Sequence, residues 1–372
     1  MVFLFVAGLC LSLSASPVAT AATYESKFQI SLPVTGGTHY DRNASVLQAR
    51  DGSFWLFFAR SVEECTPTCN PDALHYNIYY MNSRDPLTWT APKRLSDRAG
   101  IDNFYGRTIA ATQDSTGNLW VFWASGGNSN SLYYYTFAPN ARPDADVAPL
   151  PRQEVPFAPY YPYPPYFNVE AVVTQGRVWV FYEDGLNNPN PAGIYVRSTA
   201  TSSVNWSAPA QIAAGYGIPK VIVDGKKGNL FRLVMVNTST DMGQVAITSG
   251  TIGDNGGTTW SAPISVVEPH DGITNWDPTI FKDDRGKYNI FYAPDLGTGA
   301  QRIEWKQSSD PDNWSNLANI VTSGGNDANS WWDYWPEATS FSFDKDIYLF
   351  YTSEQNGAVK GTGHIFLTRL TR

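Results

Sequence analysis

The feature that most constrains the fold is a short strand-like run that recurs six times along the chain. Each copy is rich in aromatic and β-branched residues, and all but the last begin with glycine. The copies are Gly52–Phe58, Gly117–Trp123, Gly176–Tyr182, Gly228–Val234, Gly286–Tyr292 and Lys345–Tyr351. Their starts are 65, 59, 52, 58 and 59 residues apart, a period typical of propeller blades. No stretch shows a sustained helical period, so the sequence predicts an all-β fold, a six-bladed β-propeller of four-stranded antiparallel blades.

A second repeat, a turn that ends in tryptophan, is offset from the first. The copies are Ser83–Trp89, Ser202–Trp206, Asn255–Trp260 and Ser308–Trp314. Polar and glycine residues favour a tight turn, and the tryptophan can pack into the blade. These turns resemble the Asp-box of sialidases, S-x-D-x-G-x-x-W, some of them shortened by a residue. The resemblance implies a structural role away from the active site.

The N-terminal segment has the pattern of a secretory signal. Val2–Ser14 is almost purely apolar but too short to span a membrane comfortably, and Ala19–Ala21 fits an A-x-A cleavage site. We therefore expect residues 1–22 to be a signal peptide and residues 23–372 to form a single propeller domain. The protein is expected to be secreted, monomeric and without a membrane partner.

Cysteine usage and charge narrow the class of protein. Only Cys65 and Cys69 lie beyond the predicted signal, and in an exported protein they are expected to form a disulfide. The net charge of −8, from 26 basic and 34 acidic residues, argues against nucleic acid as a partner. The four histidines show no metal-ligand spacing, so we expect no metal and no cofactor. The 14% of aromatic residues suits strands and also surfaces that stack on sugar rings.

A charged residue precedes each repeated run, near the start of the predicted innermost strand. The six are Arg42, Arg107, Glu170, Lys220, Asp277 and Glu337. Because innermost strands converge on the central channel, we expect these charges to form a ring at one mouth of it. Gathering them is costly unless they pair or bind something, so the ring is either a polar ligand site or a structural salt-bridge plug.

Aromatic segments lead into several of these charges. They are Phe104–Tyr105, Tyr160–Phe167 and Trp331–Trp335. The proline-rich second segment is unsuited to a central strand and is predicted to be a loop. Such rings could stack on sugars or cap the core. Tyr105, Trp276 and Trp335 are the predicted sugar contacts.

The opening of the first predicted blade resembles that of sialidases. Arg42, the strand that ends at Arg60 and the loop residue Asp72 correspond to an F/Y-R-I-P arginine, an A-E-x-R strand and a loop aspartate. The resemblance implies that Arg42 and Arg60 bind the substrate and that Asp72 is the general acid/base. It also implies a tyrosine nucleophile, for which Tyr334 is the nearest candidate, with Glu337 or Glu170 as its base. The sequence departs from the family at Lys220 and Asp277, where blades four and five should supply further carboxylate-binding arginines.

A second resemblance concerns Trp276–Pro278 and Trp335–Ala338. These segments are similar to the D-P and E-A segments of five-bladed glycosidases that hydrolyse arabinosides and xylosides. That resemblance implies two carboxylates, one acting as general base and one as general acid, among Glu170, Asp277 and Glu337.

The leading hypothesis is a sialidase-like exo-glycoside hydrolase that acts on a glycan with an acidic or polar terminal sugar. One alternative is a lectin-like propeller without catalysis, because the arginine set is incomplete. Another is a polysaccharide lyase acting on uronic acids, in which Arg42, Arg107 and Lys220 hold a carboxylate and Tyr334 or His270 is the base. We also predict that residues 23–41 and Gly363–Thr371 share one blade, which would close the ring.

Overall fold

The structure, a computed structural model, is all-β in the part of the chain that it describes. The described residues are 28–31, 39–64, 74–96, 109–125, 131–156, 168–184, 192–239, 243–253, 256–269, 273–296, 301–322, 331–341, 345–355 and 363–370. These residues contain 25 strands and no helix, and so no helix that could cross a membrane. The predicted fold class is confirmed.

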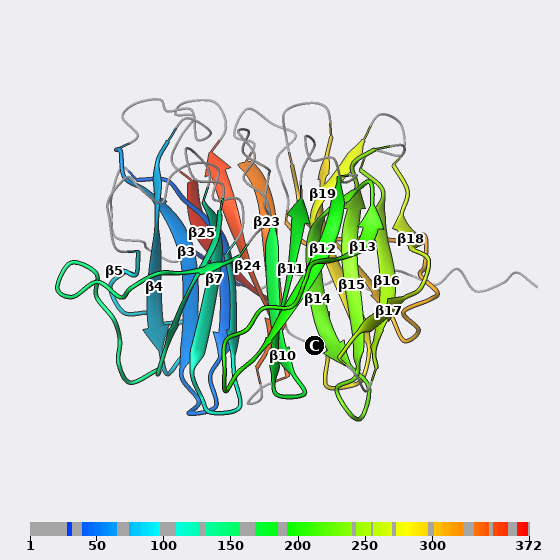
Figure 1. Cartoon of the computed structure of the whole chain (residues 1–372). Coiled ribbons are helices and arrows are strands. Elements are labelled where there is room, and N and C mark those ends of the chain that lie inside the picture. The colour runs from blue at the N-terminus through cyan, green and yellow to red at the C-terminus, as the bar shows by residue number, and fades with distance from the viewer. Residues whose placement is uncertain are drawn as a thin grey trace, which may run out of the picture.

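The strands form six antiparallel sheets, the blades, which follow one another in chain order (Figure 1). Blade 1 consists of β2 (Asp41–Gln48), β3 (Phe54–Ser61), β4 (Tyr76–Ser83) and β5 (Lys93–Arg94). Blade 2 consists of β6 (Ile109–Gln113), β7 (Leu119–Ser125), β8 (Ser131–Phe137) and β9 (Gln153–Val155). Blade 3 consists of β10 (Val169–Thr174), β11 (Arg177–Asp184), β12 (Gly193–Ala200) and β13 (Ala210–Ala214).

The second half of the ring repeats this pattern with one variation. Blade 4 consists of β14 (Tyr216–Asp224), β15 (Leu230–Asn237), β16 (Val245–Ile252), β17 (Thr258–Trp260) and β18 (Ile264–Val267). Both β17 and β18 pair with β16, so the outermost strand of this blade is split into two short pieces. Blade 5 consists of β19 (Thr274–Lys282), β20 (Tyr288–Asp295), β21 (Glu304–Ser308) and β22 (Asn319–Ile320).

The last blade joins both ends of the chain. It consists of β23 (Trp331–Ser340), β24 (Ile347–Gln355), β25 (Gly363–Leu370) and the N-terminal β1 (Phe28–Ser31). Phe28 pairs with Arg369 and Ser31 pairs with Phe366. The predicted closure by both termini is confirmed for residues 28–31 and 363–370, and it covers the edge that β25 would otherwise expose. Asp41, at the end of the predicted range 23–41, lies in blade 1 instead.

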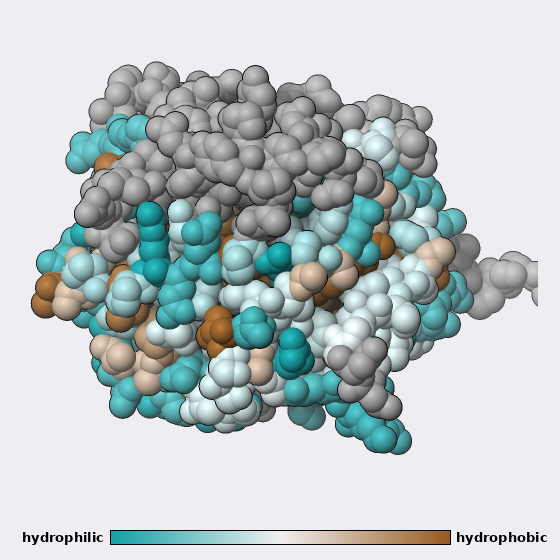
Figure 2. Space-filling model, viewed as in Figure 1, coloured by the Kyte–Doolittle hydropathy of each residue, from teal (hydrophilic) through white to brown (hydrophobic). Residues whose placement is uncertain are grey.

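The core lies between the blades rather than within them. Each of the six hydrophobic clusters of buried residues draws on two neighbouring blades. The repeated runs of the sequence are the second strands, and successive side chains such as Phe57 and Phe58 are both fully buried because they face two different neighbours. The side view in Figure 2 shows hydrophobic residues only in small, separate areas of the described surface.

The turns that end in tryptophan link each blade to the one before it. Trp89 of blade 1 packs edge-on against Phe350 of blade 6, with ring centroids 6.0 Å apart. Trp206 of blade 3 packs against Phe122 of blade 2 at 6.1 Å in the same way. Trp260 of blade 4 follows this rule as well, since its ring lies edge-on to Phe181 of blade 3. The tryptophans of these turns therefore pack between neighbouring blades, where the sequence had predicted packing into the blade.

Two of these turns share one hydrogen-bond pattern. In the turn of blade 5, the Asp312 amide donates to the Asp310 carboxylate at 3.0 Å, and the Trp314 indole donates to the Pro311 carbonyl at 2.8 Å. The turn of blade 1 makes the same two hydrogen bonds. The amide two residues after Asp85 donates to the Asp85 carboxylate, and the Trp89 indole donates to the carbonyl of the residue after Asp85. A short aspartate side chain that accepts from the backbone two residues on is a common way to hold a tight turn.

We expect Asp310→Ala to lower the free energy of unfolding by about 0.5–1.5 kcal/mol, because an exposed turn loses one hydrogen bond. Urea unfolding followed by fluorescence measures this. The neighbouring Ser309→Ala is the matched control, since Ser309 is exposed and surface changes of this kind stay within about 0.5 kcal/mol. Equal stability of the two variants would contradict a structural role for the aspartate.

Candidate active site

Four of the six innermost strands carry a β-bulge at the same place near their start. The register shifts between Arg42 and Ser45 in β2, between Gly217 and Lys220 in β14, between Trp276 and Thr279 in β19, and between Tyr334 and Glu337 in β23. In each bulge one non-glycine residue has a left-handed backbone. These residues are Asn43 (φ 58°), Ile218 (φ 53°), Asp277 (φ 49°) and Trp335 (φ 48°). Such residues cost about 1–3 kcal/mol each and cluster at functional sites.

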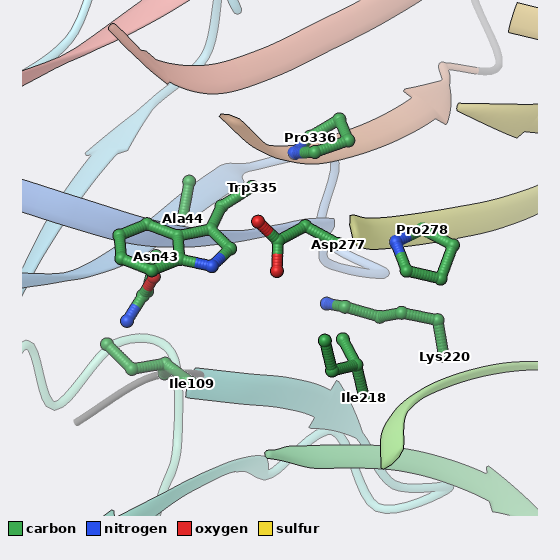
Figure 3. A pocket seen from close by; sticks show the side chains of 9 residues that line it. All are labelled: Asn43, Ala44, Ile109, Ile218, Lys220, Asp277, Pro278, Trp335 and Pro336. Carbon is green, nitrogen blue, oxygen red and sulfur yellow. The ribbon is translucent and has the colours of Figure 1, made fainter. Parts of the chain in front are cut away.

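The side chains of these four residues line a single pocket. Its empty volume is about 300 Å³, and its other lining residues are Ala44, Ile109, Lys220, Pro278 and Pro336. Blades 1, 2, 4, 5 and 6 all contribute, so the pocket lies where the inner strands converge. Figure 3 shows the Asp277 carboxylate directed towards the Trp335 indole, and the Lys220 ammonium directed into the space between the strands. The bulges thus aim one side chain from each of four blades at the same point.

Next to the pocket, Lys220 joins two glutamates from other blades. Its Nζ lies 2.9 Å from Glu170 Oε2 in blade 3 and 2.8 Å from Glu337 Oε2 in blade 6. The three side chains are only 10–15% exposed. Glu170, Lys220 and Glu337 lie at the same depth in the channel. Each of them pairs with the structurally equivalent position of the second strand in its own blade. Half of the predicted ring of charges is therefore an ion-paired triad.

Burial and charge act in opposite directions on this triad. Burial lowers the pKa of Lys220, but the charges of Glu170 and Glu337 outweigh burial and the net shift is upward. The pKa of Glu337 is raised to about 7, mainly by burial and also by the Glu170 charge, although Lys220 lowers it. Lys220 is therefore charged near neutral pH.

Arg42 and Asp277 lie at a different level of the channel from the triad. In the hydrogen-bond register, Ser45 and Thr279 occupy the places that Glu170, Lys220 and Glu337 occupy in their own blades. Arg42 and Asp277 come earlier in their strands, closer to the mouth. The charges predicted at nearly the same place in each blade are thus divided between two levels. Arg42 precedes the left-handed residue of its bulge and Asp277 is that residue, whereas Lys220 and Glu337 lie two residues after theirs.

Arg42 and Tyr334 lie at the boundary of blades 1 and 6. Arg42 is buried, and its guanidinium carbon is 4.0 Å from the centroid of the Tyr76 ring and 5.3 Å from that of Trp335. The Tyr334 hydroxyl contacts the Tyr40 hydroxyl, and the Tyr334 ring packs edge-on against Trp335. The Arg42 guanidinium lies between the rings of Tyr76 and Trp335 and holds Trp335 in place. The Trp335 wall of the pocket is therefore supported by packed side chains behind it.

Arg60 and Trp276 have structural contacts. Arg60 donates two hydrogen bonds, of 2.7 and 3.1 Å, to the buried Asp41 carboxylate. Burial raises the pKa of Asp41 to about 7, although the Arg60 charge lowers it. The Trp276 indole donates to the Thr274 hydroxyl at 2.9 Å, and the pocket is lined by its neighbour Asp277 instead. The roles of Arg60 and Trp276 in substrate binding stay predictions.

Several predicted residues fall outside the described part of the chain. These are Asp72, Cys65, Cys69, Tyr105, Arg107 and His270. The disulfide, the proton donor and the second arginine of the ring therefore stay predictions. Within the described ranges, no group of three or more histidine, cysteine, aspartate or glutamate side chains is placed to hold a metal ion.

The structure describes the residues on both sides of the segment that carries Asp72. The end of β3 and the start of β4 lie at the same end of blade 1 as the start of β2. Ser61 pairs there with Tyr76, and the neighbouring Arg60 pairs with Asp41. Just beyond the strands, the Glu63 carboxylate accepts a 2.9 Å hydrogen bond from the His75 amide and also contacts the imidazole ring. Both ends of the segment thus leave the blade on the side of the pocket.

Asn43 and Ile218 were not identified from the sequence. A signal for them exists, since three of the four left-handed residues are followed directly by proline, in Ile218-Pro219, Asp277-Pro278 and Trp335-Pro336. Proline at one place in several blades is unusual inside a sheet and marks a bulge.

Comparison with known proteins agrees with this architecture. No family model matches the chain, and no curated protein matches it. Among solved structures, it resembles the Hadza microbial sialidase Hz136 with a TM-score of 0.59 at 14% identity, over 89% of this chain and 66% of that one. It resembles the NanB sialidase from Streptococcus pneumoniae with a TM-score of 0.58 at 11% identity, over 92% of this chain and 70% of that one.

A third neighbour is an enzyme of different specificity. The α-L-arabinofuranosidase Arb93A from Fusarium graminearum has a TM-score of 0.57 at 13% identity, over 89% of this chain and 93% of that one. At such low identities the likeness concerns the fold. The protein therefore has the six-bladed propeller fold found in sialidases and related glycoside hydrolases, which confirms the sialidase-like fold predicted from the sequence.

Proposed function

We propose that the protein is a secreted glycoside hydrolase that removes a terminal sugar bound in the pocket at the channel mouth. The observation that carries the proposal is the Asp277 carboxylate, which faces the Trp335 indole in a pocket built from strained residues of four blades. Concave sites with an aromatic wall and a few convergent polar groups are typical of sugar-cleaving enzymes. The fold shared with two sialidases and an arabinofuranosidase supports the same class of reaction.

In the proposed reaction, two carboxylates act on opposite sides of the glycosidic bond. Asp72 donates a proton to the glycosidic oxygen as the bond to the anomeric carbon breaks. Asp277 accepts a proton from the water whose oxygen bonds to the anomeric carbon. Trp335 stacks on the sugar, and Lys220 with Glu170 and Glu337 provides a fixed charge distribution beneath it.

The contacts of Tyr334 favour two carboxylates over a tyrosine nucleophile. A phenol needs a neighbouring base to attack a carbon atom at neutral pH. The Tyr334 hydroxyl contacts Tyr40, and both of its predicted bases, Glu337 and Glu170, are paired with Lys220. In this arrangement Asp277 is the carboxylate in direct reach of a ligand in the pocket.

A panel of chromogenic glycosides tests the proposal. We expect release of the chromophore from at least one terminal sugar, and loss of that release when Trp335 is replaced by alanine. Binding of a glycan without turnover would instead identify a lectin-like propeller. A product with a new ultraviolet-absorbing double bond would identify a polysaccharide lyase. Either result would refute the hydrolase.

The role of Asp72 predicts a dependence on the leaving group. An activated aryl glycoside needs little protonation to depart, whereas an alkyl or sugar leaving group depends on the general acid. Asp72→Asn should therefore retain much of its turnover with a nitrophenyl glycoside and lose it with an oligosaccharide, and the alkaline limb of the pH profile should disappear. The matched control is Asp85→Asn, in a turn at the other end of blade 1. Equal losses with both substrates would contradict the assignment.

A further inference from the structure

Ile218 is the residue with the most strained backbone among those that line the pocket. A β-branched residue with a positive φ is a genuine outlier, since its side chain crowds the backbone there. Two neighbours hold it in place. The Glu183 carboxylate accepts a hydrogen bond from the Ile218 amide at 3.2 Å, and it lies where residue 217 would carry a Cβ, so that a larger residue there would displace the carboxylate. Pro219 follows and restricts the chain further. The strand is thus built to hold an aliphatic side chain at the pocket, where glycine or asparagine would be less strained.

Apolar groups make up most of the lining. Ile218 lies with Ile109, Ala44, Pro278 and Pro336, while Asn43, Asp277, Lys220 and the indole nitrogen of Trp335 supply the side-chain polar atoms (Figure 3). A sugar substituent that faced the apolar side would lose its hydrogen bonds to water without gaining others. The apolar lining therefore favours a ring with few exocyclic groups.

The charges favour a neutral ring. The Lys220 ammonium already contacts two carboxylates, and the third carboxylate, Asp277, faces the pocket itself. Among the described residues that line the pocket, an anionic sugar would therefore meet the Asp277 carboxylate at close range, while the Lys220 ammonium is engaged by two carboxylates. The Arg42 charge lies against the faces of Tyr76 and Trp335, behind the pocket wall.

We propose that this pocket takes a small, electrically neutral sugar ring, and that Ile218 sets the upper limit on the size of that ring. The proposal rests on the proposed function for the location of the site and narrows its substrate class. Asp277 excludes carboxylated sugars by charge, and Ile218 excludes a bulky exocyclic substituent by shape.

The test compares rings that differ in a single substituent. Methyl β-xyloside, β-glucoside and β-glucuronide carry hydrogen, hydroxymethyl and carboxylate at the same ring carbon. Methyl α-L-arabinopyranoside, β-galactoside and β-galacturonide form a second such series, and methyl α-L-arabinofuranoside adds a five-membered ring. Isothermal titration measures binding to the full-length protein, and the matching aryl glycosides measure turnover. We expect a pentoside to bind best, and each uronide to bind at least about tenfold more weakly than its neutral counterpart.

Replacing Ile218 with glycine tests the size limit directly. Glycine accepts the left-handed backbone, so the variant should fold and melt at the same temperature as the parent or higher. The ratio of hexoside to pentoside affinity should rise about tenfold or more, as expected for a substituent admitted to an apolar pocket. Gln175→Gly is the matched control, because Gln175 also has a positive φ (52°) but lies in an exposed turn of blade 3. It should leave the ratio unchanged.

The outcomes separate this inference from the proposed function. Preferred turnover of a uronide or a sialoside would overturn the inference and leave the hydrolase intact. Binding of neutral pentosides that is lost in Trp335→Ala, without turnover of any glycoside, would support the inference and refute the hydrolase. Failure of every neutral ring to bind, or an unchanged ratio in Ile218→Gly, would overturn the inference.

Discussion

Replacing Asp277 with asparagine is expected to lower kcat by about 10²- to 10⁴-fold, the usual contribution of general acid–base catalysis. Asparagine has the same shape and tolerates the left-handed backbone that Asp277 adopts, at φ 49°. The bulge, the pocket and the stability should therefore be retained. The amide is a poor base, so the water that attacks the anomeric carbon would no longer be deprotonated.

Steady-state kinetics with the substrate found in the glycoside panel measure this effect. Added azide, a nucleophile that needs no base, should restore part of the turnover in the variant. The control is Asp284→Asn, an exposed position at the opposite end of the same blade. A variant at Asp277 with more than about one tenth of the parental kcat would exclude Asp277 as the base.

Replacing Lys220 with methionine is expected to lower the free energy of unfolding by about 3–5 kcal/mol, as is typical when one partner of a buried ion pair is removed. Glu170 and Glu337 would then share a buried site without the cation that each contacts at 2.9 and 2.8 Å. Denaturant unfolding at neutral pH measures the loss. Lys226→Met, in the exposed turn after β14, is the matched control and should change the stability by less than about 0.5 kcal/mol.

Two further measurements identify the cause of that loss. In the parent, the pKa of Glu337 is raised from 4.5 to about 7, so the folded state binds its proton more tightly than the unfolded state. Its contribution to stability is therefore greatest below pH 4.5 and declines as the pH rises towards 7. Without Lys220 the carboxylates repel more strongly, so the decline should be steeper. The variant Lys220→Met/Glu170→Gln/Glu337→Gln carries no charge in the triad and should recover most of the stability. A loss that is independent of pH and is not recovered would contradict an electrostatic cause.

The triad also explains how a channel lined by charges remains stable. Charges that converge from several blades would repel one another or lose hydration if they were left alone. Here one ammonium satisfies two carboxylates, and Asp277 and Arg42 lie at a separate level nearer the mouth. Half of the predicted ring is therefore ion-paired, and its interpretation as a polar ligand site stays a prediction.

The number of blades and their strand content could be predicted from the sequence alone. Strand periodicity and the recurrence of one apolar run are local properties, and each run must be buried on both faces by a neighbouring copy. The role of the tryptophan turns is equally local, since Asp310 and Trp314 bond within a few residues of themselves. Charges near the starts of the inner strands could be assigned to one mouth because propeller topology places those starts together.

The pairing of those charges was decided by tertiary structure. Lys220 and Glu337 are 117 residues apart and meet only because the ring closes through blade 6. Ser45 rather than Arg42 stands at their level, because the register that begins at the β2–β3 turn pairs Ser45 with Phe57 and leaves Arg42 opposite Ala59. The same holds for Arg60, whose partner Asp41 is set by cross-strand pairing. Strand content follows from local preferences, whereas the site depends on register and ring closure, which arise only when distant strands hydrogen-bond.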